Sequence, residues 1–138
     1  MKQVEHIGIA VRDISLSSSL YESLLGVPCY KTELVSSEGV ETAFFQVGDS
    51  KIELLSATNE DSVIAKFIDR KGEGIHHIAF KVDDIYAEME RLKADGFTLL
   101  NEQPKEGADD KLVCFVHPKG TSGVLIELCQ DVNNPTPY

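Results

Sequence analysis

Apolar residues follow two different spacings along the chain, and the order of these spacings predicts the same series of elements twice. Short apolar runs that alternate with polar residues predict strands around His6 and His77. Further strands are expected at 29–34, 41–47 and 51–55 in the first half, and at 97–102, 112–117 and 123–129 in the second. Glycine and proline turns separate these runs.

A helix is predicted after the first strand of each half. The apolar residues that mark the two helices are Leu16, Leu20 and Leu24 in the first half, and Ile85, Met89 and Leu92 in the second. Asp13 or Ser15 can cap the first helix and Asp83 or Asp84 the second, while Gly26 suits a helix C-cap. Each half therefore has the order βαβββ.

An internal repeat relates the two halves. Residues 6–14 match residues 77–85 without a gap, and Ile-Glu-Leu at 52–54 recurs at 126–128. Both halves thus open with a histidine and close with a glutamate. The repeat aligns His77 with His6 and leaves the adjacent His76 on the parity that faces the core, so we select His77 as the functional residue.

These elements predict an α+β fold in which two paired βαβββ modules form a curved, cup-like mixed sheet with helices on the outside. We expect a single domain over 1–138, with modules at about 1–58 and 75–130. A linker helix at about 61–71 joins them, because Val63, Ile64, Phe67 and Ile68 follow helical spacing.

Strand parity predicts that the repeated histidines and glutamates share one face. Alternate side chains of a strand point to opposite faces, so His6 and His77 lie opposite the branched residues that pack against the helices. Glu53 and Glu127 each lie between two core aliphatic residues and therefore share the helix-free face. If the sheets curl together about a pseudo-two-fold axis, all four side chains converge.

Four such ligands suit a divalent metal ion. A single histidine in an apolar strand is more often structural, but the repetition of both residue types favours a metal site formed by His6, Glu53, His77 and Glu127. Two neutral imidazoles and two carboxylates balance the charge of a dication and suit Co, Zn, Mn, Ni or Fe(II). We interpret Cys129, two residues past Glu127, as packing at the strand end.

Composition excludes several other classes of protein. A net charge of −10 without a clustered basic stripe argues against nucleic-acid binding, and no apolar run is long enough to span a membrane. Cys29, Cys114 and Cys129 lie far apart, without disulfide-like spacing. The N-terminus reads directly into a strand rather than a secretory signal, so a cytoplasmic protein is expected.

Several motifs resemble the vicinal-oxygen-chelate (glyoxalase) superfamily, and within it the methylmalonyl-CoA epimerase family. They are GIHHIAFKVDDI at 74–85, SVIAKFI at 62–68, KIELL at 51–55 and HPKGTSGVLIELCQ at 117–130. The likeness runs from about Val4 to Gln130. It implies a cup around one divalent metal held by His6, His77 and Glu127, with a further ligand at Glu53 where some relatives have Gln.

The resemblance also implies an isomerase that epimerises methylmalonyl-CoA. A proton is removed from C2 and returned to it through a metal-stabilised enolate, with Glu127 as one base and Glu41 as a second candidate. A strict alignment places the family's second acid at Thr42 instead. Lys105, Lys111 and Lys119 are candidates for contacts with coenzyme A phosphates. Members of the family are commonly homodimers, and the partner implied is a small acyl-CoA substrate.

Other readings remain open at this point. Lactoylglutathione lyase uses the same His/Glu/His/Glu arrangement, but that family usually has an Arg in the first strand and a DPDGY-like turn, which this chain lacks. An Fe(II) extradiol dioxygenase needs an open position that Glu53 would fill. Metal-free binding modules of the same fold tend to lack the metal-binding residues, whereas this chain has all four.

Overall fold

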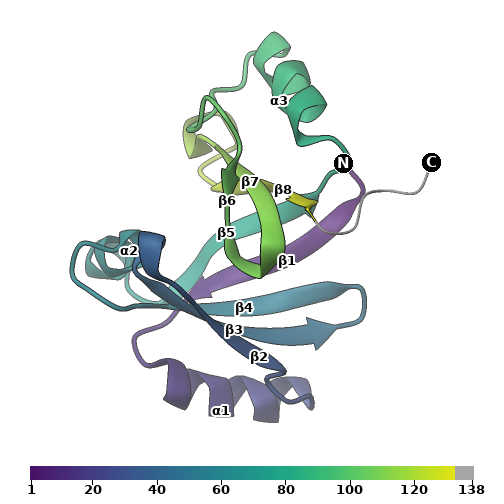
Figure 1. Ribbon diagram of the computed structural model, residues 1–138. Helices are drawn as coiled ribbons and strands as arrows, with labels where there is room; N and C mark the ends of the chain where they lie inside the picture. Colours follow the sequence, from purple (N-terminus) through teal and green to yellow (C-terminus); the bar gives the residue numbers. More distant parts are fainter. Residues whose placement is uncertain (133–138) are drawn as a thin grey trace. The chain divides into compact units, whose positions relative to one another are not determined.

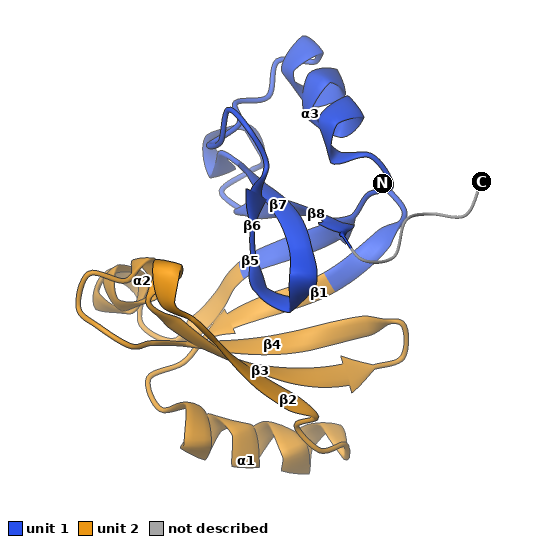
Figure 2. Ribbon diagram, viewed as in Figure 1, with its two compact units in different colours: residues 1–5, 77–138 blue, residues 6–76 orange. Residues whose placement is uncertain are grey.

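A computed structural model describes residues 1–132 of the chain. Two compact units share these residues: one contains residues 6–76, and the other contains residues 1–5 and the chain from His77 onward (Figure 2). The expected domain extends to residue 138, so its last six residues lie outside the described part. We describe each unit by itself.

The unit of residues 6–76 has the order βαβββ, followed by a further helix (Figure 1). Its strands lie in the order β2-β3-β4-β1, with β4 parallel to β1 and the other neighbours antiparallel. The elements are β1 (Gln3–Ala10), α1 (Ile14–Leu25), β2 (Lys31–Val35), a 3-10 turn (Ser36–Glu38), β3 (Val40–Val47), β4 (Ser50–Ala57) and α2 (Val63–Lys71).

The second unit repeats this plan. Its strands lie in the order β5-β8-β7-β6, with β5 parallel to β8. The elements are β5 (Gly74–Lys81), α3 (Ile85–Ala94), β6 (Lys105–Glu106), a 3-10 turn (Ala108–Asp110), β7 (Lys111–Val116), a 3-10 turn (Pro118–Gly120) and β8 (Ile126–Asp131). The predicted α+β class with two βαβββ modules is confirmed.

Helix α1 packs on its sheet through residues other than its evenly spaced leucines. Ile14, Tyr21 and Leu25 pack against a buried cluster on one face of the sheet that includes Phe45 and Leu54. Asp13 caps the helix by accepting a hydrogen bond from the backbone of Leu16, and Gly26 ends it in the left-handed conformation, with φ of 71°. The capping predictions are confirmed, but the ridge of Leu16, Leu20 and Leu24 points to solvent.

Helix α2 covers part of the face that we expected to be free of helices. Ile64, Phe67 and Ile68 pack against a cluster that includes Ala10 and Leu55. Ala10 lies opposite Leu55 in the β1–β4 register, two residues from the Gly8–Glu53 pair, so all of them lie on one face. The expectation was therefore wrong at this end of the sheet, because a linker that is itself an amphipathic helix must bury its apolar side.

The strand predicted at 97–102 is reduced to a single bridge between Leu99 and Val116. The backbone N–H of Leu100 still donates to the carbonyl of Phe115. The backbone N–H of Phe115 then donates to the side-chain oxygen of Asn101, at 2.9 Å, rather than to a backbone carbonyl. The ladder therefore stops there, and β6 pairs with the rest of β7.

Candidate functional site

His6 and Glu53 form a buried pair within the first unit. Nδ1 of His6 lies 3.1 Å from Oε2 of Glu53, and each residue is 5% exposed. In the parallel β1–β4 register, Glu53 lies opposite Gly8, two residues beyond His6. Because Gly8 has no side chain, the carboxylate can extend along the strand toward the imidazole.

His77 and Glu127 form the corresponding pair in the second unit. Nε2 of His77 lies 3.6 Å from Oε1 of Glu127, and the two residues are 5% and 6% exposed. Glu127 lies opposite Ala79 in the β5–β8 register, again two residues beyond the histidine. The small side chain of Ala79 takes the place that Gly8 has in the first unit, so the repeat in sequence becomes a repeat in geometry.

Buried carboxylates next to imidazoles are candidate metal ligands. A charged group that leaves water is stable only when it is paired, hydrogen-bonded or bound to a cation. Imidazole nitrogen and carboxylate oxygen are ligands for borderline divalent metals, and each pair supplies one of each within a few ångströms. That both pairs bind one and the same ion stays a prediction.

Glu41 does not share the face of Glu53. In the antiparallel β3–β4 register, Glu41 lies opposite Ser56, whereas Phe44 lies opposite Glu53. Parity therefore places Glu41 on the face of Leu54, the side that α1 covers. Thr42, which is buried, lies on the face of Glu53 and occupies the place where a second acid was considered.

The other two histidines, His76 and His117, make contacts that are typical of structural residues. The ring of His76 meets Phe67 of α2 edge-on at a centroid distance of 5.0 Å. Burial, with a smaller effect of Arg70, lowers the pKa of His76 to about 4, so its ring is neutral at pH 7. Nδ1 of His117 accepts the backbone N–H of Lys119 at 3.0 Å and caps the turn that follows.

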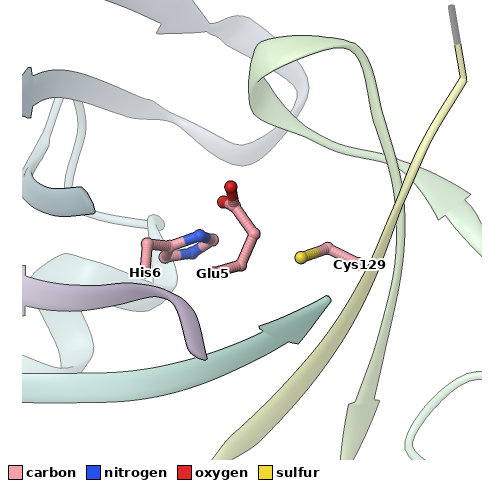
Figure 3. A group of neighbouring side chains, drawn as sticks. All are labelled: Glu5, His6 and Cys129. Carbon is pink, nitrogen blue, oxygen red and sulfur yellow. The ribbon is translucent and has the colours of Figure 1, made fainter. Parts of the chain in front are cut away.

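Cys129 lies close to a buried carboxylate that the sequence did not single out. Its Sγ lies 3.5 Å from the carbonyl oxygen of Phe80, and a carboxylate oxygen of Glu5 lies within 4.8 Å of the same sulfur. Figure 3 shows both side chains, with His6 next to Glu5 in the chain. Cys129 is fully buried, which agrees with its interpretation as a packing residue.

Sequence reasoning missed two phenylalanines that lie beside the buried pairs. Phe44 lies opposite Glu53 and Phe115 opposite Glu127, each on the neighbouring antiparallel strand. The ring of Phe115 also meets the ring of His77 edge-on, with centroids 6.0 Å apart. The length of the turn in each hairpin fixes which residue lies opposite the glutamate, so a known turn length would have identified both phenylalanines.

The paired βαβββ modules and their repeated His/Glu pairs define a duplicated α+β protein with candidate metal ligands. The sequence profile described as the Glyoxalase/Bleomycin resistance protein/Dioxygenase superfamily matches residues 5–115. The chain belongs to this superfamily.

Named relatives cover nearly the whole chain. The chain is 38% identical to the uncharacterized protein YqjC of Bacillus subtilis, over 94% of this chain and 93% of that one. It is 38% identical to the ethylmalonyl-CoA/methylmalonyl-CoA epimerase of Cereibacter sphaeroides, over 93% of this chain and 97% of that one. A solved methylmalonyl-CoA epimerase in complex with methylmalonyl-CoA and NH4+ matches with a TM-score of 0.91 and 32% identity, over 99% of each chain.

The expected resemblance to methylmalonyl-CoA epimerases is thus confirmed. Within residues 1–132, the helices are all too short or too polar to cross a bilayer.

Proposed function

We propose that this chain epimerises methylmalonyl-CoA at C2, with His6, Glu53, His77 and Glu127 holding one divalent metal ion. One observation carries the proposal: each module buries a His/Glu pair at the same register position. The similarity to epimerases over more than nine-tenths of the chain supports the choice of substrate.

The donor set fits a divalent cation of the Co, Zn, Mn or Ni class. Two carboxylates offset its charge, and two imidazoles add ligands that these ions accept more readily than hard cations do. When bound, such an ion supplies Lewis acidity that stabilises negative charge on substrate oxygens. The pair in each unit already holds imidazole and carboxylate together, which reduces the cost of ordering the ligands.

The chain's own contribution to proton transfer is assigned to Glu127. A carboxylate that lies beside a histidine on a buried face is shielded from bulk water and can take the C2 proton from one face of the substrate. Inversion is completed when a proton from water or a second acid reaches the opposite face of C2. Glu41 has no part in this proposal, because its register places it on the face of Leu54.

Hydrogen exchange tests the reaction directly. Wild-type protein and methylmalonyl-CoA in deuterated water should give deuterium at C2, as seen by mass spectrometry. Glu127→Gln should abolish the exchange with the fold intact, whereas Glu60→Gln, a change at an exposed loop residue, should retain it. Loss of exchange in Glu41→Gln would restore Glu41 as a base.

The same assay separates the rival activity. Absence of exchange, together with turnover of the methylglyoxal–glutathione adduct, would assign the chain as a lactoylglutathione lyase and refute the proposal. Elemental analysis of purified protein after metal supplementation separates both enzymes from a metal-free binding module, which would show near-zero occupancy.

We also propose that the chain forms a homodimer through α1. Leu16, Leu20 and Leu24 form a ridge along this helix and are 72%, 64% and 71% exposed. Glu22 is the one charged residue of Ile14–Leu25, in a chain of net charge −10. Ridges spaced by four residues fit the grooves of an identical helix, and the low charge of α1 limits repulsion between two acidic copies.

Sedimentation velocity tests this interface. Wild-type protein is expected to sediment as a dimer and Leu20→Glu as a monomer. Leu100→Glu is the matched control, because it places the same charge at an exposed leucine, 52% exposed, in the other unit. A dimer that persists in Leu20→Glu would contradict the assignment.

A further inference from the structure

A lysine lies beside the buried His/Glu pair of the second unit. Nζ of Lys105 is 5.8 Å from the centre of the Phe115 ring. That ring meets the His77 ring edge-on, at an interplanar angle of 88° and a centroid distance of 6.0 Å. Phe115 also lies opposite Glu127 in the β7–β8 register, so a single ring links the lysine to both candidate ligands.

Strand register places Lys105 on the same face as Glu127. Lys105 lies opposite Val113 in the β6–β7 pair, and Val113 lies opposite Cys129, two residues from Glu127. Gly107 brings this hairpin close together, because a Cβ at that position would lie 2.9 Å from Val113. The short strand β6 thus holds the lysine against the face that carries the candidate ligands.

The first unit repeats the arrangement. Lys31 lies opposite Phe44, and Phe44 lies opposite Glu53, in a row across β2, β3 and β4. Nζ of Lys31 lies 4.6 Å above the ring of Phe44 and 3.5 Å from a carboxylate oxygen of Glu33. Each unit therefore carries a lysine, a phenylalanine, a glutamate and a histidine in the same order across its strands.

An ammonium group above an aromatic face is partly ordered before a ligand arrives. The ring attracts the cation, and the long side chain loses fewer conformations when it later binds an anion. The net charge of −10 opposes anions at long range, so an anionic substrate needs local cations near the site.

The geometry points to Lys105 and Lys31 as anion-binding residues that flank the candidate metal ligands. Their ligand is an anionic oxygen group of an acyl-CoA, either the carboxylate of the acyl part or a phosphate of the coenzyme. The choice of acyl-CoA rests on the proposed function, whereas the binding of an anion does not. Both lysines are positioned to bind substrate and need no part in proton transfer.

Calorimetric titration of two simple probes separates the possible sources of the anion. Malonate represents the carboxylate, and coenzyme A represents the phosphates. Lys105→Met keeps an apolar stem over Phe115 and removes the charge, and Lys31→Met does the same over Phe44. Lys93→Met is the matched control, because Lys93 is an exposed lysine on α3.

Each methionine variant at a ring is expected to weaken the binding of one probe about tenfold, the loss typical of one charge-assisted hydrogen bond. Lys105→Arg should restore most of the affinity, and Lys93→Met should change it less than twofold. A loss confined to malonate assigns that lysine to the carboxylate, and a loss confined to coenzyme A assigns it to a phosphate. Unchanged affinity for both probes, or an equal loss in Lys93→Met, would overturn the inference for that lysine.

The two proposals fail in different ways. Weaker anion binding in Lys105→Met without deuterium exchange in wild-type protein would reject the epimerase and keep the anion site. Exchange in wild-type protein with unchanged affinities in both methionine variants would keep the epimerase and reject the anion site. In an active enzyme, the loss should fall on KM and leave kcat nearly unchanged, since these lysines bind substrate without joining the chemical step.

Discussion

Replacing Gly107 with alanine tests how closely the β6–β7 hairpin must pack. A Cβ at Gly107 lies 2.9 Å from Cγ1 and 3.2 Å from Cγ2 of Val113. Val113 is 5% exposed and belongs to the apolar cluster on the face of Glu127. Because φ at Gly107 is −123°, alanine can adopt the backbone conformation without strain, and the loss should come from the clash.

The expected loss of stability is about 1–2 kcal/mol. Non-bonded carbons prefer about 3.5–4.0 Å, so the new methyl group overlaps Cγ1 of Val113 by about 0.6–1.1 Å. Val113 cannot move aside easily, because a β-branched side chain is stiff at χ1. Overpacking of this kind costs about 1–3 kcal/mol. The stiffer unfolded chain of the alanine variant offsets about 0.4–1 kcal/mol of that cost.

Urea unfolding followed by circular dichroism measures this loss. The midpoint of Gly107→Ala should fall at an unchanged m-value. Gly120→Ala is the control, because its Cβ would lie at an ordinary 3.7 Å from Phe97 and should not destabilise the protein. Val113→Ala removes the clashing atoms, so its cost should be smaller in the Gly107→Ala background than in wild type. Equal stability of the two glycine variants, or strictly additive costs, would refute the reasoning.

Three further predictions concern stability. In dilute, monomeric protein, Leu20→Ser should change the free energy of unfolding by less than about 0.5 kcal/mol, whereas Tyr21→Ala should cost about 2 kcal/mol or more, as urea unfolding will show. Ser62→Ala should cost about 1 kcal/mol in the same assay and Ser62→Asp much less, because the buried Ser62 hydroxyl accepts the backbone N–H of Ile64 in the first turn of α2. Burial opposes ionisation of Asp131, but its ion pairs with two lysines outweigh burial and hold the pKa below its usual range. That stabilisation is present above the unfolded pKa and is lost as pH falls through the folded pKa, so thermal melts of Asp131→Asn should depend less on pH below about 4.

The sequence predicted the helix α1 but not the side that packs on the sheet. Leu16, Leu20 and Leu24 form one apolar stripe, and Ile14, Tyr21 and Leu25 form another. Spacing alone does not distinguish a stripe that packs on the chain's own sheet from one that remains exposed. The choice depends on where Asp13 starts the helix relative to the strand before it, which is a tertiary property.

The face on which a strand residue lies was predicted better than the ends and pairing partners of the strands. The two-residue period of a strand is independent of tertiary contacts, so the shared face of each His/Glu pair followed from the apolar neighbours that mark the core side of each strand. Pairing partners are set by turn geometry and by side chains such as Asn101, which ends one ladder early. The face of Glu41 could not be predicted for the same reason. The parity of β3 can be related to that of β4 only after the turn between them is known, and the observed register places Glu41 on the face of Leu54.

Each His/Glu pair is completed inside one unit, and this has an evolutionary consequence. A mutation that alters the charge or the donor atom at Glu53 leaves the register of His77 and Glu127 untouched. A substitution can therefore change one copy of the duplicated site while the other copy keeps its own His/Glu pair. New chemistries can arise in such a protein by unequal drift of its two halves.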